Sequence, residues 1–210
     1  MTLEHQAGTT LADFQAAPAA DIAWAAPATM VYAAAGTRRA AALAGIASES
    51  EAYASWSRRQ MMAACRLIFA HGVKHLFTIL ATPGQFQEVG RYRDRLLEWI
   101  AWGAAGPEAM DDYREVGWRV RLIGGHEIDR LAAPATRLRA LPAPDGAPTL
   151  WLWVIPDEEA PWRWQQQQAM QAPVRTRSDA IGALYGAPVP PAGLFLGFGK
   201  PAVADYLLPP

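Results

Sequence analysis

The sequence predicts an α/β fold: a mostly parallel central sheet of about five to six strands, with helices on both faces. Short apolar segments alternate along the chain with longer segments of helical periodicity. Most of the short segments are apolar throughout, as strands covered on both faces are. The length of 210 residues suits one compact domain with a substantial core. We therefore expect an N-terminal arm over residues 1–27 and a single domain over residues 28–210.

The expected elements of the first half follow from apolar runs and the glycines that end them. Residues 28–34 form an apolar run that stops before Gly36, which suits a buried strand. Apolar residues then recur at helical spacing over residues 51–71 and stop at Gly72, where a helix-ending glycine belongs. The next expected elements are a strand at 75–80 and helices at 86–102 and 107–116.

The second half of the chain repeats this alternation. Residues 118–123 alternate and end at a glycine pair, which predicts a strand. Residues 128–141 have helical spacing, although Pro134 must kink or divide that helix. The remaining expected elements are a strand at 150–155, helices at 162–171 and 176–185, and a strand at 194–198.

Parallel sheets bind their ligands beyond the carboxyl ends of the strands. The turns that follow the five expected strands are therefore the candidate binding segments. They are residues 35–39, 81–84, 124–126, 156–159 and 199–201.

Composition and charge exclude several classes of partner. With 19 basic and 20 acidic residues, the net charge is −1, so no electrostatic argument supports nucleic acid or an anionic membrane as the main partner. The single cysteine, Cys65, can form neither an internal disulfide nor a cysteine-based zinc site, and a cytoplasmic location is the simplest expectation. We expect no membrane span and no secretory signal, because no apolar run is long enough and none follows a basic stretch at the N-terminus.

The common nucleotide and nucleophile motifs are absent from the sequence. It has no Walker lysine motif, no G-x-G-x-x-G after a strand, no G-x-S-x-G elbow and no H-E-x-x-H pair. Cys65 lies in the middle of an expected helix, on its apolar face. The acidic pairs at 111–112 and 158–159 are more typical of solvated segments than of a general acid/base couple.

The turn after the first expected strand is the best candidate for binding a ligand. Gly36 lets the backbone approach an anion closely, and Thr37, Arg38 and Arg39 can donate hydrogen bonds to it. A phosphate or diphosphate fits these donors. The alternative is an ordinary solvated turn, in which a glycine followed by two arginines is common.

An ordered series of segments resembles one known family. The segments are A-G-T-R-R (35–39), F-A-H-G-V (69–73), G-R-Y (90–92), R-L-I-G-G (121–125), T-R-S-D-A-I-G-A-L-Y-G (176–186), L-F-L-G-F-G-K (194–200) and A-D-Y (204–206). The series resembles the bacterial diterpene synthases that include tuberculosinol synthase and kolavelool synthase. These enzymes have the cis-prenyltransferase fold, that of undecaprenyl diphosphate synthase. The resemblance covers residues 29–208 and rests on the order and near-equal spacing of the segments.

The resemblance implies an enzyme that breaks the carbon–oxygen bond of a C15–C20 prenyl diphosphate, linear or cyclic. The cation that forms is then quenched to a terpene alcohol or olefin. The diphosphate-binding residues implied are Gly36, Thr37, Arg38, Arg39 and Lys200, and the implied catalytic residues are Tyr53 and Tyr92. Trp56, Phe77 and Phe86 are candidates for an apolar wall around the cation.

The chain departs from the family pattern in the same turn. The Asp that precedes the motif glycine in the family is Ala35 here, and the Trp after the arginine pair is Ala40. The resemblance implies Mg²⁺ as cofactor, but Ala35 removes the expected carboxylate ligand, so the metal ligands are unknown. Candidate replacements are Glu51, Glu88 and Asp205. The chain is also expected to lack a later segment that helps the resembled enzymes to form a dimer.

Three interpretations remain open from the sequence. The first is a diverged terpene synthase or prenyl-diphosphate lyase, which the retained arginines and tyrosines favour. The second is a catalytically silent subunit that binds a prenyl diphosphate or an active partner, in a homodimer or a heteromer, which the missing Asp favours. The third is an α/β domain unrelated to prenyl diphosphates.

Overall fold

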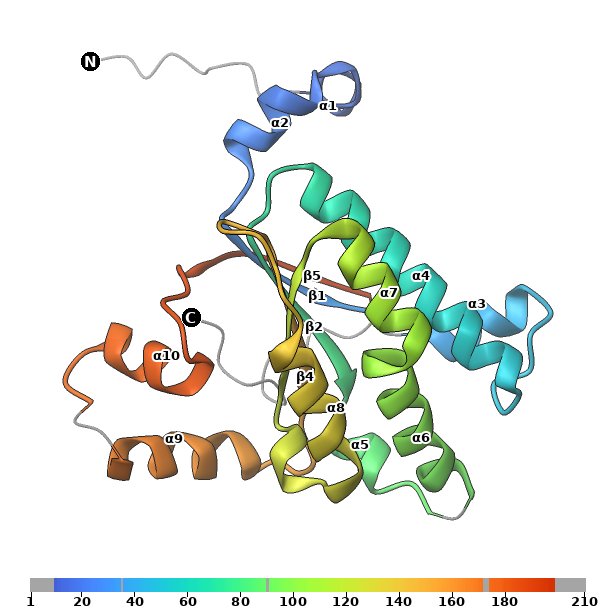
Figure 1. The fold of residues 1–210 in the computed structure, drawn as a ribbon. Coiled ribbons are helices and arrows are strands. Elements are labelled where there is room, and N and C mark those ends of the chain that lie inside the picture. Colours follow the sequence, from blue (N-terminus) through green and yellow to red (C-terminus); the bar gives the residue numbers. More distant parts are fainter. Residues whose placement is uncertain (1–9, 35, 90, 172–173, 199–210) are drawn as a thin grey trace, which may run out of the picture.

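The computed structural model describes residues 10–34, 36–89, 91–171 and 174–198, and it has the predicted α/β architecture (Figure 1). In the described residues the strands form one parallel sheet in the order β3-β4-β2-β1-β5. The strands are β1 (Thr29–Ala33), β2 (His75–Ala81), β3 (Arg119–Ile123), β4 (Thr149–Val154) and β5 (Ala192–Gly197). This confirms the predicted fold class.

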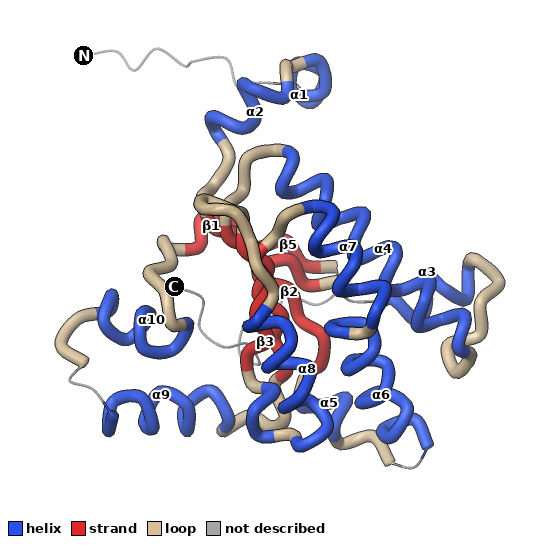
Figure 2. The backbone as a smooth tube through the Cα atoms, viewed as in Figure 1, coloured by secondary structure: helices blue, strands red, loops and turns tan. Residues whose placement is uncertain are grey.

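Helices cover both faces of the sheet (Figure 2). One face carries α4 (Glu51–Ala70), α6 (Arg91–Ala105), α7 (Pro107–Val116) and α8 (Asp129–Ala140), and the other carries α9 (Ala160–Gln171) and α10 (Arg177–Tyr185). The shorter helices are α1 (Leu11–Ala16), α2 (Ala19–Ala25), α3 (Thr37–Leu43), α5 (Pro83–Phe86) and the 3-10 turn η1 (Gly125–Glu127).

The strands divide the interior into two cores because successive side chains of a strand point to opposite faces. In β2, Leu76 packs in the core under α4 and α6, whereas Phe77 packs in the core under α9 and α10. In β4, the leucines at 150 and 152 face the first core and the tryptophans at 151 and 153 face the second. The continuous apolar runs of these strands thus reflect burial on both faces, as predicted.

Three segments differ from the sequence expectation. Residues 37–43 form α3 rather than an open turn, with Gly36 at a φ of 79° immediately before it. The helix expected at 86–102 begins only at Arg91, because Thr82 and Gln85 cap the separate helix α5. Pro134 does not divide α8; it lies on the buried face of that helix, where packing compensates for the missing amide.

The N-terminal arm and the last strand also have informative surroundings. The arm contains α1 and α2, which lie apart from the two helical layers (Figure 1). A Cβ at Gly72 would lie 2.8 Å from the Ala23 carbonyl oxygen, so this glycine lets the arm pack against the end of α4. Strand β5 is apolar but exposed, since it is an edge strand of the described sheet. Among the described helices, none is both long and apolar enough to span a bilayer.

Candidate functional site

A cavity of about 830 Å³ opens at the carboxyl ends of β1 and β2, between the sheet and helices α4 and α6. The residues after β1 that carry the predicted anion-binding turn lie at this cavity. The lining includes Gly36, Thr37, Arg38 and Arg39 together with apolar residues of all four elements. The structure therefore brings the arginine pair and a largely apolar cavity together.

The polar end of the cavity is formed by the turn and first residues of α3. Position 36 favours glycine because its φ is 79°, which other residues rarely adopt. Lack of space is not the reason, since an added Cβ would meet nothing within 4 Å. Arg38 and Arg39 are exposed, which places their guanidiniums at the mouth. Arg38 Nη2 donates to Glu88 Oε1 at 3.1 Å, and no described carboxylate forms an ion pair with Arg39.

Tyr53 is positioned beside this polar end by the start of α4. The Ser50 side chain caps the helix by accepting a hydrogen bond from the Tyr53 amide at 3.3 Å. The Tyr53 ring is buried and packs edge-on against Trp99 at 5.9 Å between centroids. Its hydroxyl lies 2.9 Å from Thr37 Oγ1. The first turn of α4 thus links a phenol to the anion-binding turn.

The apolar wall comes mainly from matching faces of α4 and α6. On α6 the lining residues recur at helical spacing, at Leu96, Trp99, Ile100, Gly103 and Ala104. On α4 they include Ser57 and Met61, one and two turns after Tyr53. These spacings were present in the sequence but were interpreted only as general core positions.

Of the three aromatic residues predicted to line the wall, the structure places only Trp56 there. The prediction for Phe77 is wrong: its ring is fully buried in the opposite core, because the neighbouring Thr78 takes the cavity-facing position on β2. The prediction for Phe86 is also wrong, since Phe86 belongs to α5 and packs against the first core without lining the cavity.

Arg58 is a site residue that the sequence analysis missed. It lines the cavity from α4, yet its side chain is only 8% exposed. Its Nη2 donates to Asp112 Oδ2 on α7, and its buried Nε has no hydrogen-bond partner in the part of the chain that the structure describes. Asp112 lies 54 residues away in the sequence, so no local pattern identifies this pair.

Several predicted site residues lie outside what the structure describes. Tyr92 falls in the first turn of α6, but its side chain is not among those described. Ala35, Lys200 and Asp205 lie outside the described residues. Their roles remain predictions.

The described residues do not fit a Mg²⁺ site at this turn. Glu51 is exposed in the first turn of α4 and does not line the cavity, and Glu88 accepts the hydrogen bond from Arg38. Among the described residues, no group of three or more His, Cys, Asp or Glu side chains could hold a metal ion. Mg²⁺ prefers several oxygen ligands, and the described side chains do not supply them here.

The thiol of Cys65 is not placed for nucleophilic chemistry. Burial in the first core raises the pKa of Cys65 to about 12, which keeps the thiol protonated at neutral pH. This agrees with the sequence interpretation of Cys65 as an apolar core residue.

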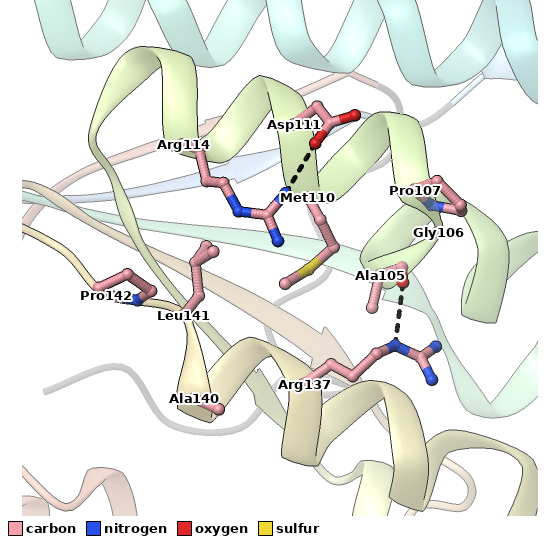
Figure 3. A pocket seen from close by; sticks show the side chains of 10 residues that line it. All are labelled: Ala105, Gly106, Pro107, Met110, Asp111, Arg114, Arg137, Ala140, Leu141 and Pro142. Carbon is pink, nitrogen blue, oxygen red and sulfur yellow. Dashed lines mark hydrogen bonds and ion pairs between the residues drawn. The ribbon is translucent and has the colours of Figure 1, made fainter.

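A second cavity, of about 730 Å³, lies between the start of α7 and the end of α8 (Figure 3). Its two arginines already have protein partners: Arg114 Nη1 donates to Asp111 at 2.6 Å, and Arg137 Nε donates to the Ala105 carbonyl at 3.2 Å. This cavity does not include the turn after β1 or the matching faces of α4 and α6 that line the first cavity.

Comparisons with known proteins identify one similar sequence and several similar folds. No protein-family model matches the chain. The chain is similar to the (+)-kolavelool synthase of Herpetosiphon aurantiacus, with 46% identity over 202 residues that cover 96% of this chain and 70% of that protein.

Solved structures are similar in fold. Lavandulyl diphosphate synthase from Lavandula x intermedia, in complex with dimethylallyl diphosphate, has a TM-score of 0.66 at 12% identity, over 90% of this chain and 83% of that one. A probable undecaprenyl diphosphate synthase from Campylobacter jejuni has a TM-score of 0.59 at 11% identity, over 85% and 78% of the two chains.

Proposed function

Since this chain belongs to the family of (+)-kolavelool synthase, we propose that it is a diverged terpene synthase that releases diphosphate from a C15–C20 prenyl diphosphate, linear or cyclic. The allylic cation is then quenched to a terpene alcohol or olefin. The observation that carries the proposal is the single cavity that joins Arg38 and Arg39 to an apolar wall of α4 and α6. A charged head and a hydrocarbon tail can be held together only where both kinds of surface meet.

The head of the substrate is bound by the turn after β1. The guanidiniums of Arg38 and Arg39, the Thr37 hydroxyl and the backbone at Gly36 supply hydrogen bonds and positive charge to the diphosphate. Lys200, which follows the last strand in the sequence, adds a further cation to this group. Donors fixed before the reaction stabilise the negative charge that develops on the leaving oxygen.

The tail and the cation occupy the wall between α4 and α6. Trp99 and Trp56 offer aromatic faces, which attract a cation without reacting with it. The remaining lining is largely apolar and keeps water away from the cation except near the polar end.

Tyr53 and Tyr92 are the proposed catalytic residues. The Tyr53 hydroxyl is 2.9 Å from Thr37 Oγ1, so it can orient a water molecule beside the diphosphate or accept the proton that this water loses. Tyr92 acts from the first turn of α6, the other helix of the cavity. These roles rest on the resemblance for both tyrosines and on geometry for Tyr53.

No step of the proposed reaction is assigned to Mg²⁺, because the described residues do not fit a metal site. The position that carries an Asp in the resembled enzymes is Ala35. That loss also supports a second candidate function, a catalytically silent subunit that binds a prenyl diphosphate or an active partner, as a homodimer or a heteromer.

Release of inorganic pyrophosphate distinguishes the two functions. Farnesyl diphosphate, geranylgeranyl diphosphate and a bicyclic C20 allylic diphosphate are each incubated with the protein, with and without Mg²⁺. Release that Arg38→Ala or Arg39→Ala abolishes, and that Arg114→Ala at the other cavity leaves unchanged, supports the enzyme. Saturable binding without release supports the silent subunit, and no binding of any of the three contradicts both.

A further inference from the structure

Arg58 is a charged side chain in the wall of a largely apolar cavity. It lies on α4, and its side chain is 8% exposed. A buried charge is costly unless it has partners, and Asp112 is the only carboxylate described as pairing with it. The buried Nε has no hydrogen-bond partner among the described residues, so these residues satisfy the guanidinium only in part.

The Arg58–Asp112 pair is oriented with its positive end toward the cavity. Arg58 lines the cavity and Asp112 does not. Asp112 is also shared with Arg66, which lies 3.8 Å from its Oδ1 and outside the cavity. Arg66 is in turn shared with Glu115, whose Oε2 lies 3.9 Å away, so the four charges balance and Arg58 is the one of the four that lines the cavity.

The neighbouring ionisable groups do not offset this charge. Burial raises the pKa of the Tyr113 phenol well above its ordinary value, and burial likewise raises the pKa of Cys65 to about 12. Both groups are therefore neutral at pH 7. Of the described residues that line the cavity, the charged ones are Arg38, Arg39 and Arg58, so the full charge nearest to this part of the cavity is positive.

Arg58 lies farther along α4 than Tyr53, the residue that contacts the anion-binding turn. Tyr53, in the first turn of α4, contacts Thr37, and Arg58 follows five residues later. At 1.5 Å of rise per residue, Arg58 is about 7.5 Å farther along the helix axis. The cavity thus has cations at its mouth, where an anion compensates them, and one cation partway along the tail.

We propose that Arg58 is a specificity-determining residue that confines the positive charge of the reacting cation to the diphosphate end of the cavity. The inference rests on the proposed function, since it concerns the cation which that function generates. When the carbon–oxygen bond breaks, both bonding electrons leave with pyrophosphate and the allylic carbons carry the charge. Cyclisation or a hydride shift would move that charge along the chain, toward Arg58, where like charges repel.

The consequence is early quenching. The allylic cation is captured by the oxygen of a water molecule, which then loses a proton to the released pyrophosphate to give an alcohol. Alternatively, the cation loses a proton from an adjacent carbon to the same pyrophosphate to give an olefin. Cations rearranged deeper in the cavity are disfavoured. Arg58 is not a catalytic residue in this account, because it neither takes nor gives a proton and touches no leaving group.

The test measures the electrostatic penalty directly, without turnover. Two probes are titrated calorimetrically into the full chain: geranyl thiodiphosphate and its 8-ammonio derivative, which adds one positive charge at the end of the C10 chain. The Kd of the ammonio derivative divided by the Kd of geranyl thiodiphosphate measures the penalty for a positive charge placed near Arg58. We expect Arg58→Gln and Arg58→Met each to lower this ratio by about tenfold.

Matched variants separate charge from packing. Arg58→Lys retains the charge and should keep the ratio within about twofold of the unmodified protein. Asp112→Asn removes the counter-charge and should raise the ratio, a change opposite in sign. Arg66→Gln removes the second cation from the same carboxylate, outside the cavity, and should lower the ratio by less than about twofold.

The outcomes that overturn the proposal are distinct. An unchanged ratio in Arg58→Gln and Arg58→Met contradicts it while leaving the proposed function intact. If geranyl thiodiphosphate binds neither of those variants, Arg58 is needed for folding or for binding the diphosphate. That result also overturns the proposal. If geranyl thiodiphosphate does not bind the unmodified protein, this inference fails, whereas the proposed function fails only if the C15 and C20 diphosphates do not bind either.

Discussion

The Thr37 and Tyr53 hydroxyl oxygens lie 2.9 Å apart, which connects the turn after β1 to the first turn of α4. Thr37 is half-buried, and the ring of Tyr53, a residue of α4, packs against Trp99 of α6. Either hydroxyl can donate to the other, so the pair can change its donor direction when an anion or a water molecule binds nearby. This places a proton-carrying group beside the two exposed arginines.

Replacing Tyr53 by Phe is expected to reduce pyrophosphate release by about 100-fold, the usual scale for a lost acid or base. The ring packing against Trp99 is retained, so the free energy of unfolding should change by no more than about 1 kcal/mol, the net value of one hydrogen bond. Steady-state kinetics and urea unfolding measure the two effects. Release that stays within threefold of the unmodified protein would remove Tyr53 from the proposed mechanism.

Replacing Glu88 by Gln is expected to improve the affinity for inorganic pyrophosphate about threefold. The carboxylate of Glu88 engages Arg38 at 3.1 Å and competes with an incoming anion for that guanidinium. The Arg38 side chain is 51% exposed and the Glu88 side chain is 34% exposed, so the free energy of unfolding should change by less than about 1 kcal/mol. Calorimetric titration measures the affinity.

The matched control is Glu98→Gln. Glu98 lies on α6 with its side chain exposed, 3.9 Å from Arg130, and does not line the cavity. Its substitution should leave pyrophosphate affinity unchanged. Equal effects at both positions would indicate a general change in net charge rather than competition at Arg38.

The sequence was sufficient for the fold and for one side of the site. Buried strands have continuous apolar runs because both faces of a parallel sheet are covered, and β1, β2 and β4 show this. Because β1 is an interior strand, the turn that follows it lies at the carboxyl ends of the strands and away from the outermost strand β3. Gly36 and the two arginines could therefore be found from local pattern alone.

The opposite side of the site depends on contacts between distant residues. In the sequence, nothing distinguishes Arg58 from the other arginines. Its role follows only from its contact with Asp112 on another helix. Phe77 and Thr78 are adjacent in an apolar run, and only the register of the sheet decides which of them faces the cavity. Helix α3 was missed because it is one short helix after a glycine turn, with little periodicity to identify it.

Replacing Gly124 by Ala is expected to destabilise the protein by about 3 kcal/mol, since a Cβ there combines backbone strain with a collision. Gly124 has a φ of 83°, and an added Cβ would lie 2.0 Å from the Val154 carbonyl oxygen and 2.5 Å from the Trp164 ring. Gly146→Ala is the control, with a φ of 72° and nothing within 4 Å, and should cost about 1 kcal/mol. Urea unfolding compares them, and equal losses would contradict the close packing at the end of β4.

The stability of the second core is expected to fall as the pH drops below about 6.5, the ordinary pKa of histidine. Burial, and then the charge of Arg119, lower the pKa of His75 in the folded protein. The unfolded chain therefore takes up the proton first, which favours unfolding. The contribution is fully present above the unfolded pKa and is lost as the pH falls through the folded one. The Trp151 indole also donates to His75 Nδ1 at 3.4 Å, which requires the unprotonated ring.

Urea unfolding followed by tryptophan fluorescence at pH 7 and pH 5 measures this loss. Arg119→Gln should reduce it, because one of the two causes that lower the pKa of His75 is removed. His75→Phe, which stacks on Trp151 without titrating, should reduce it further. If the His75→Phe variant loses as much stability between pH 7 and pH 5 as the unmodified protein, the acid sensitivity arises from other groups. Protonation of His75 is then not its cause.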